Sequence, residues 1–489
     1  MYFFLAQFAA GVVIAPRKLT EFMPLYRAKE DLATHFDKEE VEEIGLLKLD
    51  ILGLKTLTII KNILLEIEEK EGRTIDLANI ELNDQKTFRI FQKGDSDGIF
   101  QFESEGMREY LKKTKPSRIE DLIVLNALYR PGPLESGMAS CYVDRKLGKE
   151  KVQYLFSELE IILNDTLGII VFQEQVMQIL VRIGGFSMSE ADEMRKVMGK
   201  KREDQIPALE KEFLDRAVKR GYDKKKVQEL FSQIKTFAGY GFNKSHSTAY
   251  AYLAYQTAYL KAHFPVYFMA AHLSSEAEKT AQASKLIKYV SEAKKMGITI
   301  LAPDINKSSE LFRVESEKAI RFGLLSLKNV GSAAVSSIIQ SREKNGLFLD
   351  YDDFITRVDL TKVNKTVLES LIKAGAFDSF AFRRRVLFES VSEVIKASAS
   401  MEKKSLDRQR SLFAPGETKI SLIPEEMLAL PEWSEKELIK GEKEFDRVLS
   451  AKFFQVPFHL AIGFQSLSVF GMYHVTITVI AYYGYQVRH

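Results

Sequence analysis

The sequence predicts an α+β protein that is mainly helical, and three observations support this. Residues 61–300 have the pattern of helices separated by Gly- and Pro-containing turns. Residues 320–380 have the pattern of short helices joined by tight hairpins. Residues 41–60 (VEEIGLLKLDILGLKTLTII) carry apolar side chains on both faces of an extended chain, which is typical of a buried strand. We therefore expect short strands near the N-terminus, then helices, then helical hairpins.

Composition bounds the possible classes of protein. The 489 residues suffice for roughly three domains. Hydrophobic residues make up 46% and charged residues 28%, which excludes a fibrous or wholly disordered chain. The single cysteine, Cys141, excludes an intrachain disulfide and a cysteine-based zinc site, and it fits a reducing cytoplasm. The 70 Lys and Arg residues nearly balance the 67 Asp and Glu residues, so only local charge can indicate partners.

Two charged residues interrupt the apolar segment 41–60. Lys48 and Asp50 are two positions apart, so in a strand they project from the same face. A carboxylate in a buried strand is costly unless it is paired or binds a metal ion. Asp50 therefore either pairs with Lys48 or a distant arginine, or ligates a metal beside a phosphate-binding lysine. The metal interpretation requires further carboxylates, because one aspartate cannot hold two Mg²⁺ ions.

A basic cluster follows in the middle of the chain. Residues 194–226 contain twelve Lys or Arg residues and six Asp or Glu residues. The densest part holds Arg195, Lys196, Lys200, Lys201 and Arg202. Such a run is either a solvated helix face, or a clamp for a triphosphate or for a nucleic-acid backbone.

The segment AGYGFNKSHSTAYAYLAYQTAYLKAHFP predicts a glycine turn followed by a long helix that stops at Pro265. Ser245 is the expected N-cap. The free amides of a helix N-terminus, together with Lys244 and His246, suit an anion. The spacing of a Walker A loop is absent. Simple helix capping is the alternative interpretation.

Two later segments, LLSLKNVGSAAVSSII (324–339) and VNKTVLESLIKAGAFDSF (363–380), each resemble a helix-hairpin-helix. In that motif the backbone amides of the hairpin hold a nucleic-acid phosphate without reading bases. Helix pairs that merely pack are the alternative. Asn329 stands where a glycine is usual. The candidate DNA contacts are Lys328, Asn329 and Gly331 in the first segment, and Lys373 and Gly375 in the second.

The polar segment 399–420 contains a short peptide, Gln409-Arg410-Ser411-Leu412-Phe413. Leu412 and Phe413 in a loop are natural anchors for an apolar pocket of a partner, and Gln409 can hydrogen-bond at its rim. Peptides of this form also arise by chance. Further on, no charged residue occurs from Phe453 to Val487, and residues 469–485 are long enough to span a membrane.

The order of these segments resembles the bacterial DNA polymerase III alpha subunit, the C-family replicative polymerase. The resemblance covers about residues 9–445. It rests on AAGVVIAP, KLDILGLKTL, GIFQFESEGM, ALYRPGP, GIIVFQEQVM, MRKVMGKK, GYGFNKSHSTAYAYLAYQTAYLKAHFP and IKAGAFD. It implies five regions: the C-terminal part of the palm (1–60), the fingers (61–300), a tandem helix-hairpin-helix (301–390), a linker with a clamp-binding peptide (391–450), and a divergent apolar tail (451–489).

The resemblance also implies roles for individual residues. Asp50 matches the third catalytic carboxylate of the palm, and Lys48 a lysine near the phosphates of the incoming nucleotide. Arg195 and Lys196 match a basic pair that holds the triphosphate, usually two arginines. The other implied roles belong to Lys200, Ser245 and His246 around the nucleotide, and to Gln409, Leu412 and Phe413 on the sliding clamp.

The implied activity is the addition of dNTPs to a primer 3′-hydroxyl with two Mg²⁺ ions. The implied partners are primer–template DNA, dNTPs, the sliding clamp and other replicase subunits. A cytoplasmic location without a membrane is expected. An Asp-x-Asp motif that carries the family's other two palm carboxylates would precede residue 1, so we expect no polymerisation by this chain alone.

Alternatives to that interpretation concern both the function and the tail. The chain could be a non-catalytic fragment that binds DNA and the clamp. A helix-hairpin-helix repair protein is disfavoured, because the resemblance extends far beyond residues 320–380. The family pattern ends after Glu444, where a reading-frame change or a disrupted gene is the preferred explanation and a membrane anchor the alternative.

Overall fold

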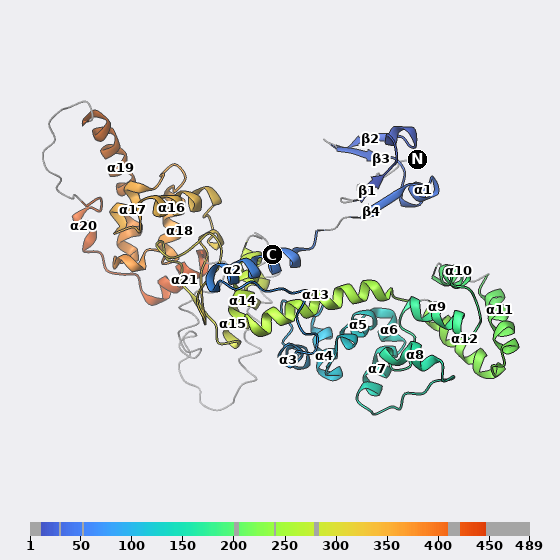
Figure 1. Ribbon diagram of the computed structural model, residues 1–489. Helices are drawn as coiled ribbons and strands as arrows, with labels where there is room; N and C mark the ends of the chain where they lie inside the picture. Colours follow the sequence, from blue (N-terminus) through green and yellow to red (C-terminus); the bar gives the residue numbers. More distant parts are fainter. Residues whose placement is uncertain are drawn as a thin grey trace. The chain divides into compact units, whose positions relative to one another are not determined.

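The computed structural model describes residues 11–28, 31–50, 53–199, 205–238, 241–277, 283–408 and 421–445 (Figure 1). It divides into two units, Met1–Asn62 and Ile63–His489. Helices dominate and the strands are short, so the predicted mainly helical α+β class is confirmed. Within the described ranges, no helix is both long and apolar enough to cross a membrane. The apolar tail 451–489 lies outside the described residues.

The first unit holds two small antiparallel sheets. Strand β1 (Gly11–Ile14) pairs with β4 (Leu47–Asp50), and β2 (Leu25–Ala28) pairs with β3 (Asp31–Thr34). The single turn η1 (Leu19–Glu21) and helix α1 (Lys38–Glu43) lie between these strands in the sequence. Met23, Val41 and Leu46 form a small buried cluster.

The prediction of a long buried strand over 41–60 was wrong. Helix α1 ends at Glu43, and strand β4 has only four residues. Leu47 and Leu49 are 56% and 43% exposed. In the register of the sheet they face Ile14 and Val12, which are also exposed. A two-stranded sheet has too few strands to bury both of its faces, so an apolar sequence pattern does not guarantee burial here.

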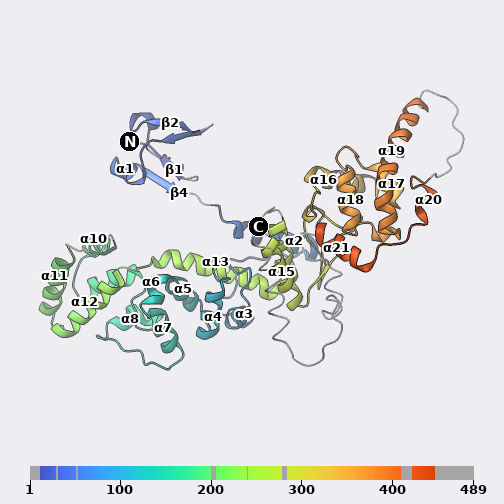
Figure 2. The ribbon, with the colours of Figure 1, turned by 180° about the vertical axis from the view of Figure 1, so that it is seen from behind.

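The second unit begins with helices that pack around a long central one. Helix α13 (Lys244–His263) contacts α3 and α5 along its length, and both views show the three side by side (Figures 1 and 2). It ends before Pro265, as predicted, and α14 (Pro265–Ala277) follows. The earlier helices are α2 (Lys55–Glu71), α3 (Gln85–Lys93), α4 (Glu105–Thr114), α5 (Ile119–Leu128), α6 (Pro131–Glu135), α7 (Met138–Lys146), α8 (Leu159–Leu163) and the single turn η2 (Asn164–Thr166).

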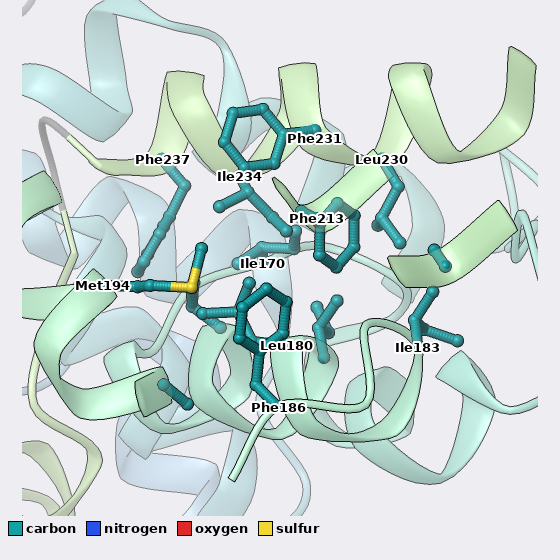
Figure 3. Close-up of a cluster of buried hydrophobic side chains, with 14 of the residues drawn as sticks. Ile170, Leu180, Ile183, Phe186, Met194, Phe213, Leu230, Phe231, Ile234 and Phe237 are labelled. Atoms are coloured by element: carbon teal, nitrogen blue, oxygen red, sulfur yellow. The ribbon is translucent and has the colours of Figure 1, made fainter. Parts of the chain in front are cut away.

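Four further helices share a second apolar cluster with Leu159 and Leu163 of α8 (Figure 3). They are α9 (Gln173–Arg182), α10 (Met188–Gly199), α11 (Ile206–Lys219) and α12 (Lys224–Ala238). Phe213 and Phe231 lie at the centre of the cluster with rings 5.6 Å apart. Met194 and Met198 of α10 are buried in it, whereas Arg195 and Lys196 are not buried. This packing fixes which face of α10 carries the basic residues.

The remaining elements build the hairpin region. A three-stranded sheet has the order β5-β7-β6. The elements are α15 (Ala283–Lys295), β5 (Thr299–Leu301), β6 (Arg313–Ser316), β7 (Ala319–Arg321), η3 (Leu324–Ser326), α16 (Ser332–Asn345), α17 (Tyr351–Arg357), α18 (Lys365–Lys373), η4 (Asp378–Phe380), α19 (Arg384–Arg408), α20 (Glu425–Leu428) and α21 (Glu435–Phe445).

The last described residues pack back onto this hairpin region. Leu422 and Ile423 are buried, and the amide of Leu422 donates to Asp352 at 3.2 Å. Glu442 of α21 forms a buried ion pair with Arg384 at 2.8 Å. Helix α19 continues to Arg408, so the polar segment expected from residue 399 begins as a helix.

Candidate functional site

Helix α13 begins at Lys244, and its cap is Asn243. The Asn243 side chain accepts a hydrogen bond from the amide of His246 at 2.8 Å. The prediction of Ser245 as the N-cap was therefore wrong. Phe242 forms a bridge with Phe172, which keeps the chain extended up to Asn243, so that residue, two positions before Ser245, caps the helix. Ser245 and His246 are consequently exposed residues of the first helical turn.

A single glutamine links this turn to the basic helix α10. Arg195 Nη1 donates to Gln173 Oε1 at 3.1 Å. The backbone amide of Gln173 donates to the Phe242 carbonyl at 2.9 Å, and its side-chain nitrogen lies 3.4 Å from the Gly241 carbonyl. Two segments that sequence reasoning treated separately thus meet at the start of α9. We call Gln173, Arg195, Lys196, Lys244, Ser245 and His246 the α10–α13 site.

Carboxylates surround the cations of the α10–α13 site. Asp192 contacts Arg195 at 2.8 Å and Lys196 at 2.9 Å. Hydrogen bonds from Lys196 and Arg195 hold the pKa of the Asp192 carboxyl below its ordinary value. Asp165 pairs with the Lys244 ammonium at 3.3 Å. These pairs are solvent-exposed and individually weak, so an incoming anion could replace them at small cost.

A carboxylate also contacts the backbone at this helix start. Glu174 accepts a hydrogen bond from the Lys244 amide at 2.9 Å. This bond satisfies one of the amide groups that a helix N-terminus leaves without an intrahelical partner. An anion at the same place would compete with Glu174 for that amide.

Aromatic side chains line the same helix start. The Arg130 guanidinium stacks 4.2 Å from the centre of the Phe242 ring, and burial lowers its pKa. The His246 ring lies 4.2 Å from that of Tyr250. Sequence reasoning did not assign Arg130, Gln173 or Phe242 to a site. The signal was present, because all three occur within the motifs ALYRPGP, GIIVFQEQVM and GYGFNKSHS.

The predicted palm residues belong to the other unit. Lys48 is half-buried in β4, and Asp50 pairs through its backbone with Gly11. Within the described ranges, no group of three or more His, Cys, Asp or Glu residues could hold a metal ion. The described side chains therefore do not fit a complete metal centre. Lys200, Gln409, Leu412 and Phe413 lie outside the described residues.

The first hairpin turn presents unused backbone amides. Asn329 has a left-handed backbone with φ +65°. Val330 is buried and its amide donates to Leu327 at 3.3 Å. Lys328, Asn329 and Gly331 are exposed, and their amides donate no hydrogen bond within the part of the chain that the structure describes.

The second predicted turn has no such amides. Gly375 also has a left-handed backbone, with φ +81°, but it is buried. Its amide donates to Ile372 at 3.0 Å, and the next amide, of Ala376, donates to Leu371 at 2.9 Å. The Arg384 guanidinium packs directly over Gly375. This turn closes the C-terminus of α18, and its donors are already engaged.

Three family models match the chain. The bacterial DNA polymerase III alpha NTPase domain matches residues 4–53, and the finger domain of the same subunit matches residues 56–221. A helix-hairpin-helix motif matches residues 297–387. Arg195 and Gln173 lie within the finger-domain match. Residues 56–221 are thus similar to the finger domain of a bacterial DNA polymerase subunit.

Curated relatives extend the match over most of the chain. DNA polymerase III subunit alpha of Aquifex aeolicus is 45% identical over 418 residues, which are 85% of this chain and 35% of the relative. The subunit of Borreliella burgdorferi is 44% identical and that of Escherichia coli K12 39% identical, each over 89% of this chain and 38% of the relative. Over most of its length the chain is similar to bacterial DNA polymerase III alpha subunits, and it spans somewhat over a third of the length of these relatives.

Proposed function

We propose that this chain supplies the fingers and a DNA-holding hairpin to a DNA-directed DNA polymerase of bacterial chromosome replication. Such an enzyme adds dNTPs to a primer 3′-hydroxyl. The observation that carries the proposal is the connection of Arg195 through Gln173 to the first turn of α13. This connection gathers cations, a helix N-terminus and exposed hydroxyl and imidazole groups in one place.

A triphosphate suits this arrangement chemically. The guanidinium of Arg195 offers paired donors to phosphate oxygens, and Lys196 and Lys244 add point charges. The N-terminus of α13, with Ser245 and His246 in its first turn, favours a negative group. The phosphates would take the place of Asp192 beside Arg195 and Lys196. Lys200 extends the same basic run in the sequence.

Nucleotide binding by the purified chain tests the proposal. Titration calorimetry with a non-hydrolysable dNTP should show that Arg195→Gln weakens binding by roughly tenfold or more, the effect of losing a charge-assisted hydrogen bond. Arg89→Gln, which neutralises an exposed arginine of α3, should leave the affinity unchanged. Equal affinities of the Arg195 variant and the parent would contradict the proposed role of the α10–α13 site.

We further propose that Asp50 is one ligand of a site for two Mg²⁺ ions, with Lys48 near the nucleotide phosphates. Two ions would activate the primer hydroxyl and stabilise the leaving pyrophosphate. The other carboxylates would have to come from outside these 489 residues, so a polypeptide of these residues alone should extend no primer. Template-directed extension by that purified polypeptide would disprove this. Extension that appears only on adding a palm fragment with the missing carboxylates would support it.

DNA and protein partners complete the proposal. Primer–template DNA would meet the amides of Lys328, Asn329 and Gly331. The peptide with Gln409, Leu412 and Phe413 would bind the sliding clamp, in a cytoplasmic replicase with further subunits. Leu412→Ala with Phe413→Ala should abolish retention on an immobilised clamp, while Ser411→Ala should not. Retention of the double variant would exclude this peptide as the clamp contact.

A non-catalytic DNA- and clamp-binding fragment is the alternative. It shares the DNA and clamp contacts but predicts no nucleotide binding at Arg195. The calorimetric titration therefore separates the two functions.

A further inference from the structure

Basic side chains gather where α11 meets α12. We call the residues Arg182, Lys219, Arg220, Lys224, Lys225 and Lys226 the lysine turn. Arg220 Nη2 lies 3.3 Å from the Arg182 carbonyl, so the end of α9 joins the turn between α11 and α12. Carboxylates lie close to it as well. Asp223 accepts a hydrogen bond from the Lys226 amide at 3.0 Å as the helix cap, Glu158 accepts one from Tyr222 at 3.2 Å, and Glu229 follows Lys225 by four residues in α12.

Three of these lysines stand where a helix disfavours positive charge. Lys224, Lys225 and Lys226 are the first three residues of α12, and all are exposed. The N-terminus of a helix carries partial positive charge, so lysines there are repelled by the helix dipole and by one another. Within the described ranges, none of the three forms an ion pair with a carboxylate.

Three other lysines of the fingers lie at the opposite ends of their helices. Lys112 and Lys113 lie in the last turn of α4, and Lys235 lies in the last turn of α12. At those ends the helix dipole stabilises a cation. The three lysines at 224–226 therefore conflict with their local structure, and a ligand of opposite charge would remove the conflict.

We propose that the lysine turn is a second contact surface for the phosphate backbone of nucleic acid, distinct from the α10–α13 site. This inference rests on the proposed function, which brings DNA to the chain. Closely spaced phosphates can pair with several lysines at once and release counter-ions, without any reading of bases. An acidic protein partner would satisfy the charge as well, but it lacks that regular spacing.

Helix α12 relates the two surfaces geometrically. Phe237, near its C-terminal end, packs against Gly241 at the start of the α10–α13 site. The lysine turn lies at the opposite end of the same 15-residue helix. At the rise of an α-helix the two ends are about 20 Å apart. A strand of DNA would cover that distance with about six nucleotides.

The test compares two triple variants of the full chain. Lys224→Gln/Lys225→Gln/Lys226→Gln removes the charges that oppose the helix dipole. The control, Lys112→Gln/Lys113→Gln/Lys235→Gln, removes the same charge from exposed positions that the dipole favours. Binding of a fluorescent primer–template duplex is measured by anisotropy over a series of salt concentrations, and the midpoint of thermal unfolding is measured for each variant.

We expect opposite changes in binding and stability. The lysine-turn variant should bind DNA roughly tenfold or more weakly at low salt, and the slope of log affinity against log salt should fall by about 2 to 3. Its thermal midpoint should rise, because the conflict with the dipole is gone. The control should retain most of its affinity and slope, with an unchanged or lower midpoint.

Three outcomes would overturn the inference. The first is an equal loss of DNA affinity in both triple variants. The second is a salt slope of DNA binding that does not change in the lysine-turn variant. In that case the proposed function would still stand if Lys328→Gln weakens DNA binding. The third is displacement of the DNA by polyglutamate of equal charge at equal concentration, which would indicate an acidic protein partner instead. A parent chain that binds no DNA would contradict the proposed function as well.

Discussion

The turns at Asn329 and Gly375 share a left-handed φ angle but have opposite environments. Both residues have positive φ, +65° and +81°. The first turn is exposed and has unused amides, whereas the second is buried beneath Arg384 and uses its amides to close α18. Left-handed backbone therefore marks a turn in the sequence without indicating its role. Access to the amides, which depends on what packs over the turn, decides whether it can hold a phosphate.

The largest expected effect comes from removing the cation that covers the second turn. Arg384 is 5% exposed and pairs with Asp378 at 2.6 Å and Glu442 at 2.8 Å. Arg384→Met should cost about 3–5 kcal/mol of unfolding free energy, because it removes the cation that is paired with the buried carboxylate of Glu442. Urea denaturation measures this. The neighbouring Arg385→Met is the control, and an equal loss in the two variants would refute the importance of the buried pairs.

A methyl group at Gly375 should have the next largest effect. Its Cβ would clash with the Arg384 guanidinium, on a backbone that already disfavours a side chain. We expect Gly375→Ala to cost roughly 3 kcal/mol, by strain and displacement of the guanidinium. Gly297 has φ +75°, and a methyl group there would meet no atom within 4 Å, so Gly297→Ala should cost only about 1 kcal/mol. If the two variants lost the same stability in urea, backbone strain alone would explain the destabilisation caused by Gly375→Ala, without a contribution from Arg384.

Substitutions at Asn329 should separate conformation from chemistry in the first turn. Asn329→Gly preserves the left-handed backbone and should change stability by less than about 0.5 kcal/mol, with DNA affinity retained. Asn329→Val should cost about 1–2 kcal/mol and weaken DNA binding several-fold, because a β-branched residue resists this conformation. Anisotropy with duplex DNA measures the binding. If the valine variant bound DNA with the affinity of the parent, this turn would not be part of the DNA interface.

The smallest expected effect is a change in salt dependence, and it differs between the two turns. Lys328→Gln should lower the salt slope of DNA binding by about 1, as expected for one phosphate contact. The stability difference between Arg384→Met and the parent should hardly change from about 50 to 500 mM salt, because buried pairs are screened less than exposed ones. A strong salt dependence of that difference would show that water reaches the Arg384 pairs.

Much of the helical order could be predicted from the sequence. The end of α13 just before Pro265 and the helices of the hairpin region follow from local rules of propensity and backbone geometry. The prediction of a buried strand at 41–60 was wrong, because an apolar sequence does not reveal whether another layer of the protein covers the strand. The prediction of Ser245 as the helix cap was wrong as well. The start of α13 depends on the bridge between Phe242 and Phe172, and Phe172 is distant in the sequence.

Some residues of the candidate site could be predicted from the sequence, whereas others could be found only from the structure. Arg195, Lys196, Lys244 and His246 were found from charge and from their motifs. Gln173 was not, because a neutral side chain becomes informative only through what it contacts, here Arg195 and the Gly241 carbonyl. The placement of Lys373 and Gly375 in a DNA contact stays a prediction that the engaged amides of that turn do not favour.

The sequence by itself determined the resemblance to the polymerase family, through its motifs and their order. It also determined the mainly helical class and the residue types able to hold phosphate, because these depend on composition and local periodicity. Tertiary structure alone decided which of two similar turns keeps free amides and how α10 reaches α13. The physical reason is that burial and hydrogen-bond partners come from residues far apart in the chain, such as Arg384 over Gly375 and Gln173 beside Arg195.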